Sequence, residues 1–235
     1  MDTLPTFSGF PQAGLAFLAN LATHNNRVWF ESQKKEYHAL LLEPAQAFVM
    51  TLGAKLQALS NSIRCDPRTD GKGVLMRLHR DTRFSPDKTP YNTHISGLFW
   101  EGSQKKTESP AFGFQIEATG MGLMTGIFKF PPAMLTAYRD AVRDDRFGTE
   151  LEDILETVRR AGKYEIAGEQ YKRVPSGYDP SHRRANLLRY DGLYAFSPHI
   201  QVSDMLTPAL VDMCYAHFQR MAPIYHWLMK TAVTK

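Results

Sequence analysis

The sequence contains only two cysteines, Cys65 and Cys214, and they lie far apart. They form no CxxC pattern, so we expect two reduced thiols in a cytoplasmic protein rather than a disulfide or a redox motif. The eight histidines form no HxH, HxxxH or HExxH pattern, and we therefore expect no metal site. Because glycine-rich dinucleotide fingerprints, nucleophile elbows and kinase signatures are also missing, we expect no cofactor.

Long apolar runs are missing as well. None approaches the ~20 residues that a membrane helix needs, so we expect no membrane partner. The opening stretch MDTLPTFSGFPQAG has neither a positively charged segment nor an apolar core, so we expect no signal peptide. Charge of one sign is not in large excess: 28 Lys and Arg residues and 24 Asp and Glu residues give a net charge of +4, which does not by itself indicate a nucleic-acid binder.

The hydrophobic pattern predicts an α+β protein with a mostly antiparallel sheet. Near the N-terminus, apolar residues recur at helical spacing, as at Leu15, Leu18 and Leu21. The middle of the chain changes to alternating segments interrupted by glycine, and Thr119–Gly122 is expected to form a hairpin turn. Helices at both ends with strands between them favour helices packed against one antiparallel sheet.

One domain is expected over residues 1–235, because no stretch of the sequence has the composition of a linker. The contents of 43% hydrophobic and 22% charged residues are ordinary for a globular protein. The expected order is N-terminal helices over about residues 12–60, central strands over about 73–130, helices over about 131–162, and C-terminal strands and a helix over about 163–233.

Basic residues gather in two segments. Seven basic residues accompany four acidic ones between Arg64 and Lys88, and five accompany a single acid between Lys172 and Arg189. The two surpluses together exceed the net charge of the whole chain, so the remainder is net acidic. Two basic segments on a slightly acidic body can concentrate an electrostatic field on an anionic ligand.

The first basic segment includes RLHRDTRFSPDKTPY, residues 77–91, which we call the signature segment. It begins as an apolar strand, and Pro86 and Pro90 then impose extended or turn geometry on the residues before them. We therefore expect a strand end that leads into a structured loop, with a helix as the alternative. Loops set on a rigid scaffold often carry functional residues.

The charged side chains of the signature segment allow two interpretations. As an anion site, arginine forks and a lysine would hold a phosphate or carboxylate, and Asp81 and Tyr91 would be available for proton transfer. As a structural network, the arginines would pair with Asp81 and Asp87 and only fix the loop. Four bases and two acids leave two positive charges unmatched, which favours the anion site because burying an unpaired charge is costly. The expected binding residues are Arg77, Arg80, Arg83 and Lys88.

The signature segment resembles that of a bacterial family of unassigned function, the domain-of-unknown-function 2461 family. Members share an Arg-x-x-Arg-Asp-x-Arg-Phe core followed by an Asp/Asn-Lys pair and a tyrosine. FLANLATHNNRVWFESQKKEY and YKRVPSGYDPSHRRANLLRYDGLYA resemble the family's N-terminal helices and its later basic segment. The resemblance implies no activity, because the family has no established reaction. The matching residues here are Arg77, Arg80, Asp81, Arg83, Phe84, Asp87, Lys88 and Tyr91.

The second basic segment, residues 172–189, is expected to be a loop broken by prolines and by Gly177. A short helix should follow, with Ser181 as its N-cap. The free N–H groups at the start of that helix, together with Lys172 and Arg173, would bind an anion. A solvated basic loop is the alternative.

Three functions are consistent with these patterns. We favour a protein that binds a small phosphorylated or carboxylated ligand. If the protein is an enzyme, this ligand is its substrate. Nucleic-acid binding is the second, with Phe84 and Tyr91 stacking on bases; the modest net charge and the acids within the segment weigh against it. The third is a structural or interaction module whose Arg–Asp pairs only organise the fold.

Overall fold

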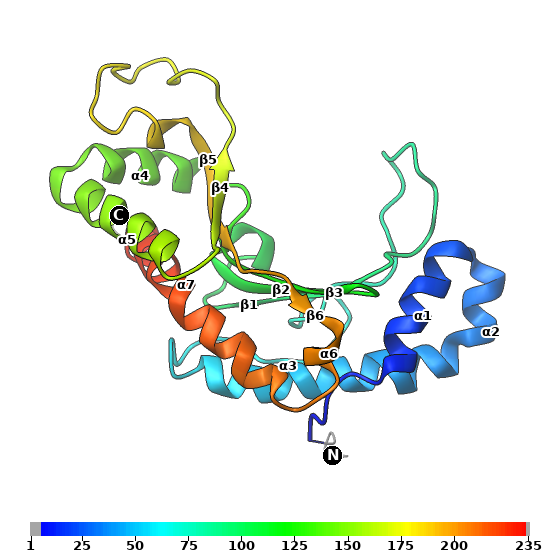
Figure 1. Cartoon of the computed structure of the whole chain (residues 1–235). Coiled ribbons are helices and arrows are strands. Elements are labelled where there is room, and N and C mark those ends of the chain that lie inside the picture. Colours follow the sequence, from blue (N-terminus) through cyan, green and yellow to red (C-terminus); the bar gives the residue numbers. More distant parts are fainter. Residues whose placement is uncertain (1–5, 234–235) are drawn as a thin grey trace. The chain divides into compact units, whose positions relative to one another are not determined.

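The computed structural model describes residues 6–233 and shows helices at both ends of the chain and a sheet formed by its middle (Figure 1). The strands follow the order β1-β2-β3-β5-β4, and β6 pairs with β3. The predicted α+β fold with a mostly antiparallel sheet is confirmed. The elements are α1 Gln12–Thr23, α2 Arg27–Tyr37, the π-helical η1 His38–Leu42, α3 Glu43–Leu56, β1 Ile95–Trp100, η2 Lys106–Glu108, β2 Ala111–Glu117, β3 Gly120–Ile127, α4 Pro132–Arg143, α5 Asp145–Arg160, β4 Glu165–Glu169, η3 Leu187–Arg189, β5 Tyr190–Phe196, β6 Ile200–Gln201, α6 Val202–Met205 and α7 Leu210–Val233.

The chain divides into two compact units, each built from separate stretches of sequence. Strands β2 and β3 and helix α7 each have residues in both units. The signature segment belongs to unit 1 and the second basic segment to unit 2. The expectation of one domain over residues 1–235 stays a prediction. Unit 1 comprises the chain up to Phe99, Gly113–Gly122 and His199–Ala216, and unit 2 comprises Trp100–Phe112, Leu123–Pro198 and the chain from His217 onward.

Unit 1 has an aromatic core shared by helices and strands. Phe48 of α3 packs edge-on against Phe114 of β2, with ring centroids 5.3 Å apart, and its ring lies 5.6 Å from that of Phe10. All three rings are buried, and large apolar rings of this kind dominate the hydrophobic stabilisation of a core. At the edge of the unit, Asn26 accepts a hydrogen bond from the Trp29 N–H at 3.0 Å and caps α2.

In unit 2, helices α4 and α5 form a hairpin whose turn is set by Asp144. The Asp144 carboxylate accepts hydrogen bonds from the N–H groups of Arg146 and Phe147 at 2.9 and 2.8 Å, which caps α5. Tyr138 of α4 is fully buried and donates its hydroxyl hydrogen to the Leu187 carbonyl at 3.0 Å. This bond ties α4 to η3.

Two local expectations differ from the structure. Residues 73–81, all of them described, form no strand and make only isolated antiparallel bridges, at Leu75 to Gly97 and at His79 to Tyr91. The charged loop follows the His79–Tyr91 bridge, and the backbone between the two bridges forms no continuous ladder. After Ser181 the chain forms turns that lead into η3 instead of the expected short helix.

The C-terminal helix contains one proline and is preceded by another. Helix α7 begins at Leu210, two residues after Pro208, while Pro223 lies within the helix and does not end it. Cys65 and Cys214 are both free, as the sequence predicts. None of the helices within residues 6–233 combines the length and the apolar character needed to span a bilayer.

Gly126 of β3 should be intolerant of a side chain. It pairs with Tyr194 of β5 at a φ of 129°, and a Cβ there would lie 2.1 Å from the Leu193 carbonyl oxygen. We expect Gly126→Ala to lower the free energy of unfolding by about 1–3 kcal/mol in chemical denaturation, because alanine rarely adopts this φ. In the control Gly122→Ala, the added Cβ meets nothing within 4 Å. A similar loss in both variants would contradict this explanation.

Candidate functional site

The signature segment forms a two-armed loop between α3 and β1. The arms pair through the Arg80 N–H to the Pro90 carbonyl at 2.9 Å and the Asn92 N–H to the Leu78 carbonyl at 2.8 Å. Figure 1 shows this loop, in the blue-green part of the colour bar, extending away from β1. Phe84 near its tip is 93% exposed, so the outer end of the loop lies in solvent.

Tyr91 anchors the base of the loop. It is only 2% exposed, and its ring centroid lies 4.3 Å from that of Phe30 and 4.9 Å from that of His79. Its backbone N–H and carbonyl bond to the side-chain amide of Asn25 at 3.1 and 2.8 Å. Burial raises the pKa of the Tyr91 phenol. The residue predicted to transfer a proton is thus packed inside the unit.

Asp81 is paired with Arg83 at the exposed side of the loop. The Arg83 Nε and Nη2 donate to the two carboxylate oxygens of Asp81 at 2.9 and 2.7 Å. The side-chain hydrogen bond from Arg83 lowers the pKa of Asp81 to about 2. A carboxylate with so low a pKa takes up protons poorly near neutral pH, which disfavours Asp81 as a general base.

Arg80 cross-links the two arms of the loop. Its side chain is 25% exposed, and Nη1 donates to Asp87 Oδ2 at 2.5 Å, to the Thr89 carbonyl at 3.2 Å and to the Thr89 hydroxyl. Asp87 also accepts the Thr89 N–H at 2.9 Å. The Thr89 N–H, then the Thr89 hydroxyl, then Arg80 lower the pKa of Asp87 to about 2. Both aspartates of the segment are therefore already bound to arginine.

The remaining positive charge of the signature segment lies on Arg77 and Lys88. Arg77 donates through Nε and Nη2 to the Asp70 carbonyl at 3.2 and 2.8 Å, and Lys88 Nζ donates to the Thr82 carbonyl at 2.9 Å. Within the described part of the chain, neither side chain has a carboxylate partner. A carbonyl oxygen carries only a partial charge, so these two cations stay without full countercharge.

A small cavity lies beside the start of the signature segment. Its volume is about 10 Å³, roughly the space of one water molecule, and Arg77, Tyr37 and His94 contribute to its walls. Burial lowers the pKa of His94, so its imidazole is neutral at pH 7. A ligand held by Arg77 would therefore lie on the surface of the loop, because this cavity is too small for it.

The second basic segment separates into exposed and buried side chains. Lys172 and Arg173, both predicted to bind an anion, are exposed, and Arg189 pairs with Glu169 at 2.8 Å. The helix that was expected to offer N–H groups to an anion is not formed. The described structure thus places no helix N-terminus beside Lys172 and Arg173.

Arg184 is the fully buried member of this segment, and each of its guanidinium nitrogens is hydrogen-bonded. Nε donates to Glu152 Oε2 at 2.9 Å, and Nη1 donates to the Val142 and Asp144 carbonyls at 3.1 and 3.3 Å. Nη2 donates to the Asp145 carbonyl at 3.3 Å and to the Thr149 hydroxyl at 3.0 Å. Arg184 therefore holds the α4–α5 turn together. Sequence patterns do not distinguish it from the adjacent Arg183.

A known protein family matches most of the chain. The profile of a family described as conserved hypothetical protein (DUF2461) matches residues 13–227. The chain belongs to this family. The resemblance found in the sequence is thereby confirmed, and the match covers both basic segments. No curated protein matches the chain. The description of DUF2461 names no activity, so membership does not assign a role to the signature segment.

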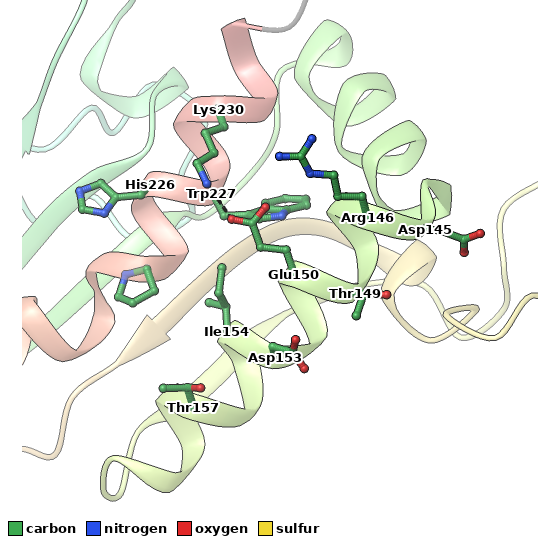
Figure 2. Close-up of a pocket in the computed structure, with 11 residues that line it drawn as sticks. Asp145, Arg146, Thr149, Glu150, Asp153, Ile154, Thr157, His226, Trp227 and Lys230 are labelled. Carbon is green, nitrogen blue, oxygen red and sulfur yellow. Dashed lines mark hydrogen bonds and ion pairs between the residues drawn. The ribbon is translucent and has the colours of Figure 1, made fainter.

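A groove of about 860 Å³ lies in unit 2 of this DUF2461 chain, between α5 and α7 (Figure 2). Glu150 and Lys230 face each other from the two helices and form an ion pair at 2.7 Å. Trp227 is buried beside them and donates its indole N–H to the Phe147 carbonyl at 3.0 Å. The groove offers an anion no surplus of positive charge, because carboxylates outnumber Lys and Arg in its lining. The lining residues are Asp145, Arg146, Thr149, Glu150, Asp153, Ile154, Thr157, Pro223, His226, Trp227 and Lys230.

The pKa of Asp87 should report the Arg80 contact. In Arg80→Ala we expect it to rise from about 2 toward, but not to, the ~3.9 of free aspartate, because Thr89 still donates. Since the folded-state pKa lies below the unfolded value, Asp87 contributes stability above pH ~4 that is lost as the pH falls toward 2. Carboxyl-detected NMR titration measures the pKa directly. Arg83→Ala should leave Asp87 unchanged, and an unchanged Asp87 in Arg80→Ala would refute the contact.

Arg184 should contribute strongly to stability. Arg184→Met leaves Glu152 and several carbonyls without their buried donor, and we expect the free energy of unfolding to fall by about 3–5 kcal/mol. Arg183→Met is the matched control: its side chain is 60% exposed and bonds the same Glu152 at 3.1 Å, so its loss should cost at most ~1 kcal/mol. Urea denaturation of both variants tests this. Equal losses of unfolding free energy would contradict the structural role of Arg184.

Proposed function

We propose that this protein binds a small phosphorylated or carboxylated ligand through its signature segment, with Arg77, Arg80, Arg83 and Lys88 as the binding residues. The observation that carries the proposal is the charge balance of the loop. Asp81 and Asp87 neutralise Arg83 and Arg80, while Arg77 and Lys88 donate only to backbone carbonyls in the described structure. A carboxylate or phosphate is a stronger acceptor for these groups than a carbonyl.

The four binding residues differ in what they offer a ligand. Arg77 and Lys88 can exchange a carbonyl for an anion without breaking an ion pair. Arg80 and Arg83 would have to share their donors with an aspartate, so they mainly add positive potential. Lys172 and Arg173 in unit 2 stay predicted binding residues, and their exposure is compatible with that role.

Catalysis has less support than binding. Tyr91 is buried against Phe30, and the low pKa of Asp81 leaves it ionised and paired with Arg83. As catalytic residues, Asp81 and Tyr91 therefore stay sequence-based predictions. The proposal assigns a ligand class and no reaction. We also propose a cytoplasmic location, because both cysteines are free.

Nucleic-acid binding is the second candidate, and the exposure of Phe84 favours it. An aromatic side chain that is 93% exposed beside Arg83, whose Cζ lies 5.7 Å from its ring, is suited to stack on a base. Tyr91, the other expected stacking residue, is buried and cannot stack on a base. A structural module is the third candidate, supported by the contacts of Tyr91 and Arg80 that fix the loop.

Lys88→Met should remove the response to anions. Wild-type protein is heated with inorganic phosphate or citrate at constant ionic strength, and we expect a rise in Tm that is lost in Lys88→Met. The charge-assisted hydrogen bond removed is worth ~1.5–3 kcal/mol, which corresponds to about ten- to a hundred-fold weaker binding. Lys35→Met is the control, because Lys35 is also an exposed lysine of unit 1, on α2.

The outcomes separate the three candidates. Loss of the Tm rise in Lys88→Met and its persistence in Lys35→Met support the proposed function. A lower starting Tm in Lys88→Met with the full rise retained indicates the structural module and contradicts the proposal. A gel shift with single-stranded nucleic acid that weakens steeply with salt and requires Phe84 favours the second candidate.

A further inference from the structure

Helix α4 and the loop after β4 surround an arginine with aromatic rings. The Cζ of Arg139 lies 5.6 Å from the ring centroid of Tyr171 and 5.3 Å from that of Tyr178. Arg143, one turn further along α4, lies 5.8 Å from the Tyr178 ring. Figure 1 shows this loop, residues 170–186, in yellow and arching over α4. All of these residues belong to unit 2.

Two guanidinium nitrogens of Arg139 have no hydrogen-bond partner in the part of the chain that the structure describes. Nε and Nη2 are both buried, and no acceptor within residues 6–233 bonds to them. These nitrogens share one edge of the guanidinium, the edge whose parallel N–H groups fit the two oxygens of a carboxylate or phosphate. The tyrosine rings stabilise the positive charge but provide no oxygen acceptor to this edge.

Arg184 shows how the same unit satisfies a buried arginine that serves only the fold. All three of its guanidinium nitrogens are hydrogen-bonded, and its Nε donates to the carboxylate of Glu152 at 2.9 Å. Arg139 has no such carboxylate at its Nε edge in the described structure. Buried polar groups are almost always paired, so an unpaired guanidinium edge points to a partner from outside the chain.

The surroundings of Arg139 are positively charged. Arg143 lies beside it on α4, and Lys172 and Arg173 occupy the same loop as Tyr171. The one acid of that loop, Asp179, accepts the Ser181 N–H at 2.8 Å. Tyr171 is 41% exposed. The loop therefore carries a surplus of positive charge, and its Tyr171 contacts Arg139.

We propose that Arg139 binds an oxyanion, the carboxylate or phosphate group of a small ligand, beneath the 170–186 loop. The Nε–H and Nη2–H groups hold two oxygens of the anion side by side. Tyr171 and Tyr178 wall the site, and Arg143, Lys172 and Arg173 attract the ligand. Because the edge is buried, the loop shifts to admit the ligand. The site is formed by residues of unit 2, whereas the signature segment belongs to unit 1.

NMR of arginine Nε–H groups tests the proposal on the whole chain. The Nε–H cross-peak of Arg139 is assigned by through-bond side-chain experiments on wild-type protein and by its absence from Arg139→Lys. Inorganic phosphate and, separately, succinate are titrated at constant ionic strength set with sodium chloride. We expect a saturable downfield shift of this peak. In Arg139→Lys, binding is followed by the backbone N–H peaks of Tyr171 and Tyr178, whose rings contact Arg139. We expect at least tenfold weaker binding there, because lysine keeps the charge but lacks the paired N–H groups.

Arg160→Lys is the matched control, because Arg160 is an exposed arginine of the same unit that already pairs with Glu156 at 2.7 Å. It should bind phosphate as wild type does. A titration in which the Arg139 peak does not move, or moves equally with chloride alone, overturns the proposal. So do unchanged phosphate-induced shifts of the Tyr171 and Tyr178 backbone N–H peaks in Arg139→Lys. If Arg139→Lys does not fold, the titration of wild-type protein still tests the proposal. Binding by the signature segment would persist in this variant, so the two sites are tested independently.

Discussion

The signature segment carries more positive charge than its own carboxylates can balance, and this imbalance governs what the segment can do. Two aspartates bind Arg80 and Arg83 and, with Thr89, tie the arms of the loop together. Tyr91, packed on Phe30 and bonded to Asn25, fixes the base of the same loop. The segment is therefore both a structural network and a source of uncompensated charge. The two interpretations of its sequence apply to different residues of one loop.

Unit 2 presents the same contrast in a second form. Arg184 is fully enclosed and bonded on every side, which makes it part of the framework of the α4–α5 turn. Arg139 lies against two tyrosine rings, and the edge with its two parallel donors finds no acceptor among residues 6–233. A fold gains nothing from burying such an edge without an acceptor, since the desolvation of the N–H groups is then uncompensated. Whether its donors are matched therefore separates a structural arginine from a binding one.

Much of the fold was predictable from the sequence because local patterns determine it. The helical spacing of leucines, the Asn26 cap, the glycine-rich hairpin and Pro208 before α7 all act within a few residues. The signature loop was predictable too, since prolines restrict their neighbours. The strand expected over residues 73–81 did not form. A strand needs regular pairing with a neighbouring segment, here residues 91–97, and local sequence does not show how regular that pairing is.

The pairing of charged side chains outside the signature segment was not predictable, because it depends on residues distant in sequence. Arg183 and Arg184 are chemically identical neighbours that both bond Glu152, yet Arg183 is exposed and only Arg184 also reaches the carbonyls of the α4–α5 turn, some 40 positions away. Arg139 and Arg143 have the spacing of an ordinary solvated helix face, and only the tyrosines of a later loop set Arg139 apart. The burial of Tyr91 was not predictable for a similar reason: its contacts with Asn25 come from a helix junction 66 residues earlier.

A crystal structure of the whole protein grown from phosphate tests the central claim most directly, because it shows where the uncompensated charge of the signature segment is used. The charge balance predicts an ordered phosphate ion within about 2.7–3.2 Å of Arg77 or Lys88 nitrogens, displacing the carbonyl contacts of at least one of them. Signature segments in which Arg77 still bonds Asp70 and Lys88 still bonds Thr82, with no anion on either, would contradict it.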